Sequence, residues 1–204
     1  MAFNPPNGLS KFMSAEHPVF MLSKLSGELV RLRETSSSNS PIERIWQSMN
    51  CAITAWHCHE WYWQLSDDQQ RGRLARTVGT SEDQSVGKFG VACQQRCLAV
   101  ALCRQIGTAA KHLEVTHDRP HVRTEPWSHE KEGVKTHAVY IFDGDDRYPD
   151  WDVYRAAFKF WSDLAVRARL VSVDTRGQLR AVSDAIATLT PMGDDEFDSL
   201  GDLS

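Results

Sequence analysis

The chain has 204 residues, with 23 lysines and arginines against 27 aspartates and glutamates and a formal net charge of −4. Apolar residues make up 41% and charged residues 25%, a composition that excludes collagen-like, coiled-coil and wholly disordered chains. No run of about 18 apolar residues occurs, and Met1–Gly8 has neither a basic region nor an apolar stretch, so we expect no membrane span and no secretory signal. Because the five cysteines are an odd number without such a signal, they indicate reduced thiols and a cytoplasmic location.

The first third of the chain predicts an irregular arm followed by two amphipathic helices. Residues 1–15 contain Pro5, Pro6 and Gly8 and form the expected arm. From about Pro18 to Glu34, leucines recur at three- and four-residue steps, which predicts a helix. Residues 35–40 form a polar loop that ends this helix. The leucines of the stripe are Leu22, Leu25, Leu29 and Leu32.

The second helix has the clearest start signal in the chain. Ser40 occupies the expected N-cap, Pro41 the first helical position, and Glu43 the position three residues after the cap. An apolar stripe carries this helix to about Leu65. The stripe consists of Ile42, Ile45, Met49, Ile53, Trp56 and Trp63.

Two further helices are expected before the periodicity changes. A short one is predicted around residues 68–77, and a third long helix runs from about Val86 to Lys111. Its expected buried stripe is Val91, Leu98, Leu102 and Ile106. Small residues at its end (Gly107, Ala109 and Ala110) would let another backbone approach closely.

The β-propensity rises after His112. One or two short strands are expected within 113–122, and residues 135–142 form a strand of good propensity. Asp143 and Gly144 then supply a turn, and Pro149-Asp150 starts a fourth long helix at about 150–169. A fifth helix is predicted over 178–189.

These elements predict a mainly α fold, a helical bundle with a small β-hairpin or sheet inserted between the third and fourth long helices. The expected organisation is an arm (1–15), a single helical domain (16–189) with a β insertion at about 113–148, and an acidic tail (190–204). The seven tryptophans are expected mostly in the core. The residues expected to be buried together are Met49, Ile53, Trp56, Leu102, Ile106, Phe160 and Leu164.

A polar cluster on the second helix is the first candidate site. His57 and Glu60 are three residues apart, so both lie on one helix face, as metal-binding carboxylate–histidine pairs of helical bundles do. A metal site would also have to recruit His112 or a residue of the β segment. The structural interpretation is a histidine hydrogen-bonded beneath tryptophans at the bundle centre. We expect no bound metal or cofactor.

The second candidate site is the end of the third long helix, where Arg104 precedes His112. An arginine and a histidine on one helix can bind a phosphate and activate a ribose hydroxyl. The pair resembles the motif of the HEPN superfamily of helical ribonucleases and nucleotide-binding modules, in which four to six residues separate arginine and histidine. Seven separate them here, which rotates them about 80° apart on an ideal helix. The resemblance implies catalytic roles for Arg104 and His112. Under the enzyme hypothesis, His57 and Glu60 complete a catalytic set with them.

Three strings also resemble a group of uncharacterised bacterial helical proteins. They are Ala55-Trp56-His57 with Trp61, Ala110-Lys111-His112, and Phe142-Asp143-Gly144 followed by Asp152-Val153 and Phe160-Trp161. The resemblance implies that these regions form one fold of bacterial or phage origin, and it implies no activity.

Charge is unevenly distributed. Residues 71–123 hold nine lysines and arginines against four acids, which is typical of a solvated helical surface. The alternative is a basic surface that binds nucleic acid or an acidic partner. Arg71, Arg73 and Arg76 are its candidate nucleic-acid contacts. Residues 190–204 hold five acids and no base, with Phe197, Leu200 and Leu203 spaced as anchors for a groove. This tail is expected either to bind a basic surface or simply to keep the chain soluble.

Two functions remain open from the sequence. The first is a non-catalytic interaction or accessory subunit of a bacterial or phage system, which acts through protein–protein contacts or self-association. The alternative is an enzyme acting on RNA or a nucleotide, with His57, Glu60, Arg104 and His112 meeting in the bundle, or a metal site of histidine and glutamate there. The distance between His57 and His112 discriminates between the two.

Overall fold

The computed structural model describes residues 17–37, 40–110, 121–131 and 133–171, together with residues 177, 181, 182, 184–186 and 188. Within these residues the chain is mainly helical and carries a small three-stranded antiparallel sheet after α5. The elements are α1 (Phe20–Glu34), the 3₁₀ helix η2 (Thr35–Ser37), α2 (Pro41–Gln64), α3 (Asp68–Val78), α4 (Val86–Arg96), α5 (Leu98–Ala109), β1 (Val122–Lys131), β2 (Val134–Asp143), β3 (Asp146–Pro149) and α6 (Asp150–Arg167).

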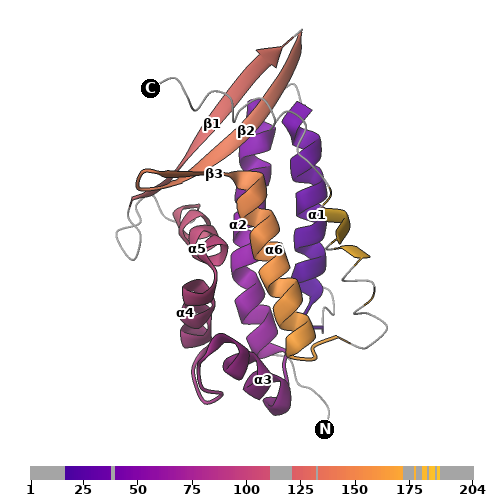
Figure 1. Ribbon diagram of the computed structural model, residues 1–204, viewed down its shortest axis with the longest axis vertical. Coiled ribbons are helices and arrows are strands. Elements are labelled where there is room, and N and C mark those ends of the chain that lie inside the picture. Colours follow the sequence, from indigo (N-terminus) through magenta and orange to yellow (C-terminus); the bar gives the residue numbers. More distant parts are fainter. Residues whose placement is uncertain are drawn as a thin grey trace.

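The long helix α2 is the centre of the molecule. It contacts α1, α4, α5 and α6 along its length. Figure 1 shows α1, α2 and α6 side by side, α4 and α5 along the other flank of α2, α3 at one end and the sheet at the opposite end. The sheet therefore extends a helical body and leaves one of its faces away from the helices.

Both predicted N-terminal helices are present. The leucine stripe of α1 and the start signal of α2 account for them. The four leucines of the α1 stripe have no exposed surface. Ser40 stands at the N-cap of α2 with an extended backbone, and Pro41 is the first helical residue. The short predicted helix is α3, which begins with a capping box between Asp67 and Gln70.

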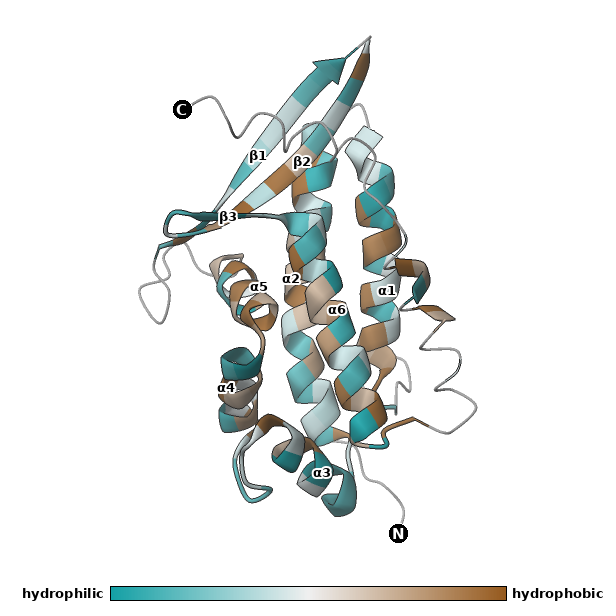
Figure 2. Ribbon diagram, in the orientation of Figure 1, coloured by the Kyte–Doolittle hydropathy of each residue, from teal (hydrophilic) through white to brown (hydrophobic). Residues whose placement is uncertain are grey.

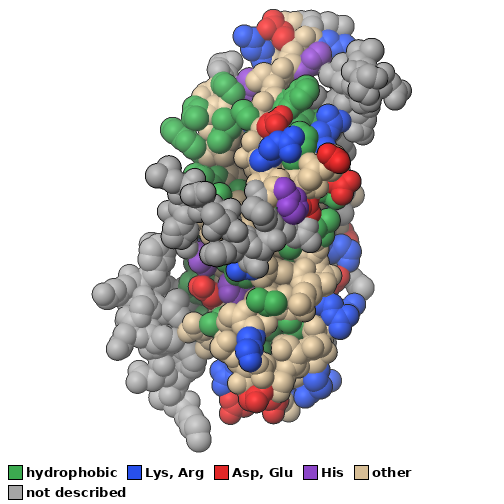
Figure 3. All heavy atoms as spheres, turned by 90° about the vertical axis from the view of Figure 1, so that its left-hand side faces the viewer, with side chains coloured by type: hydrophobic (Ala, Val, Ile, Leu, Met, Phe, Trp, Pro, Cys, Tyr) green, Lys and Arg blue, Asp and Glu red, His purple; other side chains and the backbone are tan. Residues whose placement is uncertain are grey.

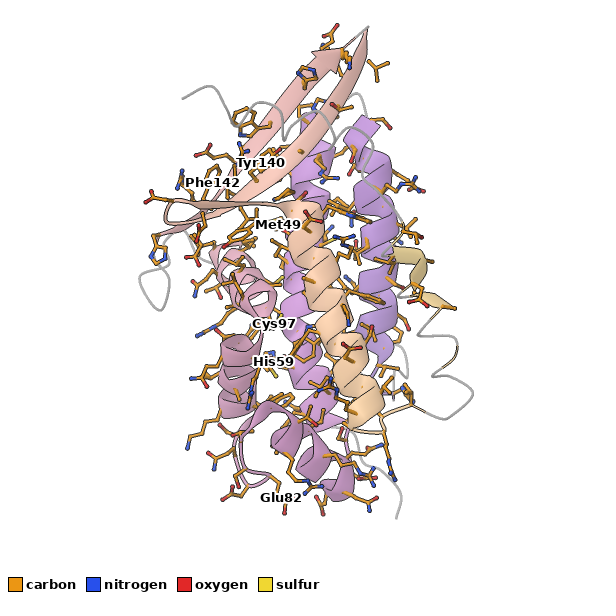
Figure 4. The ribbon with its side chains drawn as sticks, in the orientation of Figure 1. Met49, His59, Glu82, Cys97, Tyr140 and Phe142 are labelled. Carbon is orange, nitrogen blue, oxygen red and sulfur yellow. The ribbon has the colours of Figure 1, made fainter. Side chains whose placement is uncertain are left out.

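The third long helix is interrupted, which corrects the prediction of one continuous helix. Cys97 has an extended backbone (φ −145°, ψ 109°) and separates α4 from α5. Val91 and Leu98, which were expected in the buried stripe, are 45% and 41% exposed. Gly90 of α4 and Gly107 of α5 approach α2 closely instead. Neither Gly nor Pro stands at the break, so tertiary packing overrides local propensity here. Figure 4 labels Cys97 at this junction.

The sheet is a meander in the order β1-β2-β3. Strand β2 matches the predicted strand at 135–142, and Asp143 pairs with Asp146 across a turn in which Gly144 has a φ of +66°. Strand β1 begins at Val122, where the prediction had strands ending, and residues 111–120 lie outside the described part. Figure 2 shows why β1 was missed, because this strand is largely hydrophilic.

The core differs in part from the expected one. Leu102 and Leu164 are buried as predicted, whereas Met49, Ile53, Trp56, Ile106 and Phe160 are only half-buried. Three of the tryptophans (Trp63, Trp151 and Trp161) are buried, but Trp46 is 56% and Trp127 37% exposed. The largest fully buried side chains come mainly from α1, α2 and α6, namely Trp151, Trp161, Arg44, Tyr62 and Tyr154 with the α1 leucines and Phe89 of α4.

A buried ion pair joins the sheet end of α6 to α2. Arg44 is 2% exposed and donates to Asp150, to the Ser36 hydroxyl at 2.8 Å and to the Leu32 carbonyl. Burial raises the pKa of Asp150, and the adjacent Arg44 opposes this shift. Because an uncompensated buried charge is costly, the pair fixes how α6 leaves the sheet.

The predicted fifth helix is seen only in part. Residues 181, 182 and 184–186 are helical, and Ile186 is buried against the core. The expected arm (1–15) and tail (190–204) lie outside the described residues. Among the helices that the structure does describe, none combines the length and apolar character needed to cross a membrane.

Candidate functional site

The structure brings His57 and Glu60 of the predicted catalytic set together. The Nδ1 atom of His57 lies 3.2 Å from Oε2 of Glu60, one turn along α2. The two side chains are 22% and 45% exposed, so the pair stands at the surface edge of the helix. This geometry lets the carboxylate orient the imidazole.

His59, two residues after His57, is a hydrogen-bonded histidine packed against a tryptophan. This is the structural interpretation that the sequence suggested for a histidine of this segment. Its Nδ1–H donates to the Trp56 carbonyl at 2.6 Å, and its ring lies 3.9 Å from the Trp56 ring. Burial lowers the pKa of His59, and the hydrogen bond to Trp56 opposes this shift. Gly90 of α4 covers the ring so closely that a Cβ there would lie 2.8 Å from His59 Cδ2. Figure 4 shows His59 between α2 and α4.

Arg104 of α5 contacts this segment of α2 because its guanidinium group packs on the Trp56 ring. Its guanidinium carbon lies 5.6 Å from the centre of a Trp56 ring, and the group donates to Gln94 Oε1 at 3.0 Å. His112 falls outside the described residues, so the distance between His57 and His112 stays open. In the part of the chain that is described, no group of three or more His, Cys, Asp or Glu residues could hold a metal ion.

The candidate nucleic-acid residues lie on α3, at the end of the molecule opposite the sheet (Figure 1). Arg71 donates to Asp68 and, at 2.8 Å, to the Ser66 carbonyl, so its charge is engaged within the helix start. Arg123 lies on β1 at the sheet end. Arg71 and Arg123 of the predicted basic region thus lie at opposite ends of the described structure.

A second surface, which the sequence did not predict, is the face of the sheet directed away from the helices. Val122, Thr124 and Val139 line a pocket against α2 and α5, so the alternate residues of the strands lie on the other face. We call this other face the outer sheet face. It comprises Arg123, Glu125, Trp127, Ala138, Tyr140, Phe142 and Arg147.

Arginines and aromatic rings are interleaved on the outer sheet face. The guanidinium carbon of Arg123 lies 4.1 Å from the Phe142 ring centre, and that of Arg147 lies 4.7 Å from the Tyr140 ring centre. Trp127 meets Tyr140 edge-on at 5.8 Å. Figure 4 labels Tyr140 and Phe142 along β2, and Figure 3 shows hydrophobic side chains beside lysine and arginine side chains at the sheet end.

The residues of this face alternate along the sequence, but the alternation is recognisable only when the pairing of β1 with β2 is known. Arg123, Glu125 and Trp127 alternate along β1 opposite Phe142, Tyr140 and Ala138 of β2. Pro126 and the charged residues of β1 hid the strand, because both are depleted in strands. Because β1 was not predicted, the alternating residues of β2 could not be assigned to a two-stranded face.

The pocket beneath the sheet has a volume of about 270 Å³. Gln105 of α5 is 5% exposed there, and its Oε1 has no hydrogen-bond partner in the described part of the chain. Ser48, on the α2 side of the pocket, shares a hydrogen bond of 2.9 Å with Tyr154. The described lining residues are Ile45, Ser48, Met49, Gln105, Ile106, Ala109, Ala110, Val122, Arg123, Thr124 and Val139.

Comparison with known proteins gives no relative for this arrangement. No protein family matches the chain, and neither the curated proteins nor the solved structures contain a match.

Proposed function

We propose that the protein is a non-catalytic interaction protein and that the outer sheet face is its contact surface. The observation that carries the proposal is the placement of Arg123, Trp127 and Arg147 together on a sheet face that points away from the helical body. Tryptophan, tyrosine and arginine are the residues most enriched at the energetic centres of protein interfaces. The face thus has the composition of a protein-binding surface.

The chemistry of the face favours an acidic peptide with apolar anchors. The two guanidinium groups lie over ring faces. Arg123 already donates from Nε to Glu125 Oε1 at 3.0 Å and from Nη1 to the Gly144 carbonyl at 3.5 Å, so Arg147 is the guanidinium that an incoming carboxylate would meet first. By strand alternation, His129 and Lys131 follow Trp127 on the same face of β1. The tail residues 190–204 have the complementary composition, with five acids and the predicted anchors Phe197, Leu200 and Leu203.

The same geometry disfavours single-stranded nucleic acid on this face. Base stacking needs free aromatic faces. Arg123 and Arg147 already cover Phe142 and Tyr140, and Tyr140 is only 4% exposed. Carboxylates can approach the arginines from solvent without displacing them, so a peptide is the better ligand.

The test uses a full-length chain that carries Phe197→Ser, Leu200→Ser and Leu203→Ser. These substitutions remove the apolar anchors of its own tail, so the tail cannot compete with an added peptide. A fluorescent peptide of residues 190–204 should bind this chain by anisotropy, and its affinity should fall as salt rises because exposed charges are screened. Adding Trp127→Ala and Arg147→Gln should weaken binding at least tenfold, in the range of interface hot spots.

Trp46→Ala is the matched control, since Trp46 is an exposed tryptophan on α2. It should leave peptide affinity unchanged. Equal weakening by both tryptophan variants, or capture of a single-stranded RNA oligonucleotide in place of the peptide, would contradict the proposal.

The His57–Glu60 pair supports a second candidate, the HEPN-like ribonuclease or nucleotide-acting enzyme. A carboxylate 3.2 Å from a partly exposed imidazole can hold the ring as a general base. Cleavage of RNA by the wild type that is lost in both His57→Ala and His112→Ala would establish it. Cleavage that survives both substitutions would show that these histidines are not catalytic.

A further inference from the structure

We propose that the protein self-associates by pairing the free edge of β1 with the same strand of a second copy. The two strands run antiparallel, so that the two three-stranded sheets join into one continuous sheet. The inference goes beyond the proposed function, because it uses the backbone at the edge of the sheet and does not require the tail peptide.

The strand β1 is a long and open sheet edge. The order β1-β2-β3 gives it a single neighbour, and it has ten residues. Its alternate residues Thr124, Pro126, Ser128 and Glu130 are all exposed. Within the described part of the chain, Thr124 and Ser128 make no backbone hydrogen bond beyond this sheet. Such an edge is a template on which another strand can pair.

The hairpin determines which backbone groups of β1 point to the free edge. Lys131 pairs with Val134 across a two-residue loop, and the residues that flank such a loop exchange both hydrogen bonds. Because hydrogen-bonded positions alternate in an antiparallel pair, the odd-numbered residues of β1 bond to β2 and the even-numbered ones direct their N–H and C=O outward. Pro126 agrees with this assignment, because a proline in an edge strand stands where its missing N–H would face solvent. Ser128 therefore presents both backbone groups to a second strand.

Three of the possible registers between two copies of β1 are unfavourable. A pair centred on Glu125 sets two glutamates opposite each other. A pair centred on Pro126 opposes two residues that lack an N–H group. A pair centred on Trp127 sets Arg123 of each copy opposite Lys131 of the other. Proline and charged residues at an edge thus reject most partner strands, so the partner must match in sequence and register.

The register centred on Ser128 is complementary. The two copies of Ser128 lie on the two-fold axis and exchange both backbone hydrogen bonds. On the outer sheet face, Glu125 of each copy then lies opposite Lys131 of the other, and Trp127 lies opposite His129. Opposite charges that face each other across two strands stabilise the pair, and the symmetry makes this contact twice. This charge match identifies a second copy of the chain as the occupant of the edge.

The experiment is sedimentation velocity of the full-length protein over a range of concentrations, which should show a monomer–dimer equilibrium. Ser128→Pro removes the central N–H at an outward position of the kind where Pro126 already stands. It should raise the dimer dissociation constant at least about tenfold, because each copy loses a hydrogen bond. Ser128→Ala is the matched control. It removes the same hydroxyl, which lies 2.7 Å from His137 Nδ1, but keeps the N–H, so it should dimerise like the wild type.

A charge exchange tests the register without changing the backbone, even where Ser128→Pro fails to fold. Glu125→Lys should weaken the dimer, because it places two like charges opposite each other. Adding Lys131→Glu to the same chain should restore the dimer. A double variant that is no stronger than Glu125→Lys would overturn the register.

Two further results would overturn self-association through β1. The first is a protein that stays monomeric at every concentration, or a dimer that is equally stable in Ser128→Pro. The second is a dimer that is lost on Phe197→Ser, Leu200→Ser and Leu203→Ser, because the tail would then supply the contact. This second result would leave the proposed function in place, so the two ideas fail separately.

Discussion

The two histidines of α2 differ in burial, although only one residue lies between them in the sequence. The ring of His59 is covered by Trp56 and Gly90 and donates to a backbone carbonyl, whereas His57 stands at the surface beside Glu60. Helical spacing predicted the His57–Glu60 contact, because residues three apart share a face. It could not tell which of the two rings the neighbouring helix α4 would cover, because that depends on tertiary packing.

The buried histidine should make stability sensitive to acid. Because burial lowers the pKa of His59 below its ordinary value, the unfolded chain binds a proton more readily than the folded one. Unfolding free energy should therefore fall as pH decreases through the ordinary histidine range, from pH about 7 to about 5. His59→Asn, measured by urea unfolding at both pH values, should lose less stability on acidification than the wild type.

Gln64→Asn is the control for this prediction, since Gln64 is an exposed residue of α2 that does not titrate. Its loss of stability on acidification should match that of the wild type. An unchanged acid sensitivity in His59→Asn would show that His59 is not the responsible group.

At the scale of elements, glycines report how closely the helices pack on α2. A Cβ at Gly90 would lie 2.8 Å from His59 and 3.0 Å from Trp56, whereas one at Gly107 would meet Ile53 at 3.5 Å, an ordinary contact. Gly90→Ala should destabilise the fold by about 1–3 kcal/mol through overpacking. Gly107→Ala should be neutral or stabilising by up to about 1 kcal/mol, because alanine favours helix.

Denaturant unfolding of both variants measures the difference. Both positions lie in helices and receive the same methyl group, so helix propensity cancels in the comparison. If the two variants have equal free energies of unfolding, the result would contradict the close approach of α4 to His59.

The accuracy of the sequence prediction varied between elements for physical reasons. The leucine stripe of α1 and the Ser40–Pro41 start of α2 are local signals, and both elements are present as expected. The break at Cys97 and the strand β1 depend on packing against α2 and on pairing with β2, which single-sequence patterns do not contain. The outer sheet face could not be predicted, because it exists only once β1 is paired.

At the scale of the whole molecule, the sheet and α3 stand at opposite ends of the helical body (Figure 1). Two cations of the predicted basic region lie at these ends, Arg71 engaged by Asp68 on α3 and Arg123 on the outer sheet face. Arg44 and Asp150 join α2 to α6 beside the sheet and keep its orientation fixed. The outer sheet face, our proposed contact surface, thus lies beside a buried ion pair.

The most direct test of this account is a photo-crosslink from the outer sheet face. Benzoylphenylalanine placed at position 127 of the full-length chain should crosslink, on irradiation at low salt, to a peptide within residues 190–204 of the same or a second chain. Mass spectrometry of the digested product identifies the attachment site, and the yield should fall at high salt. Crosslinks that never reach residues 190–204, with a yield independent of salt, would contradict the assignment of the outer sheet face as the contact surface for the acidic tail.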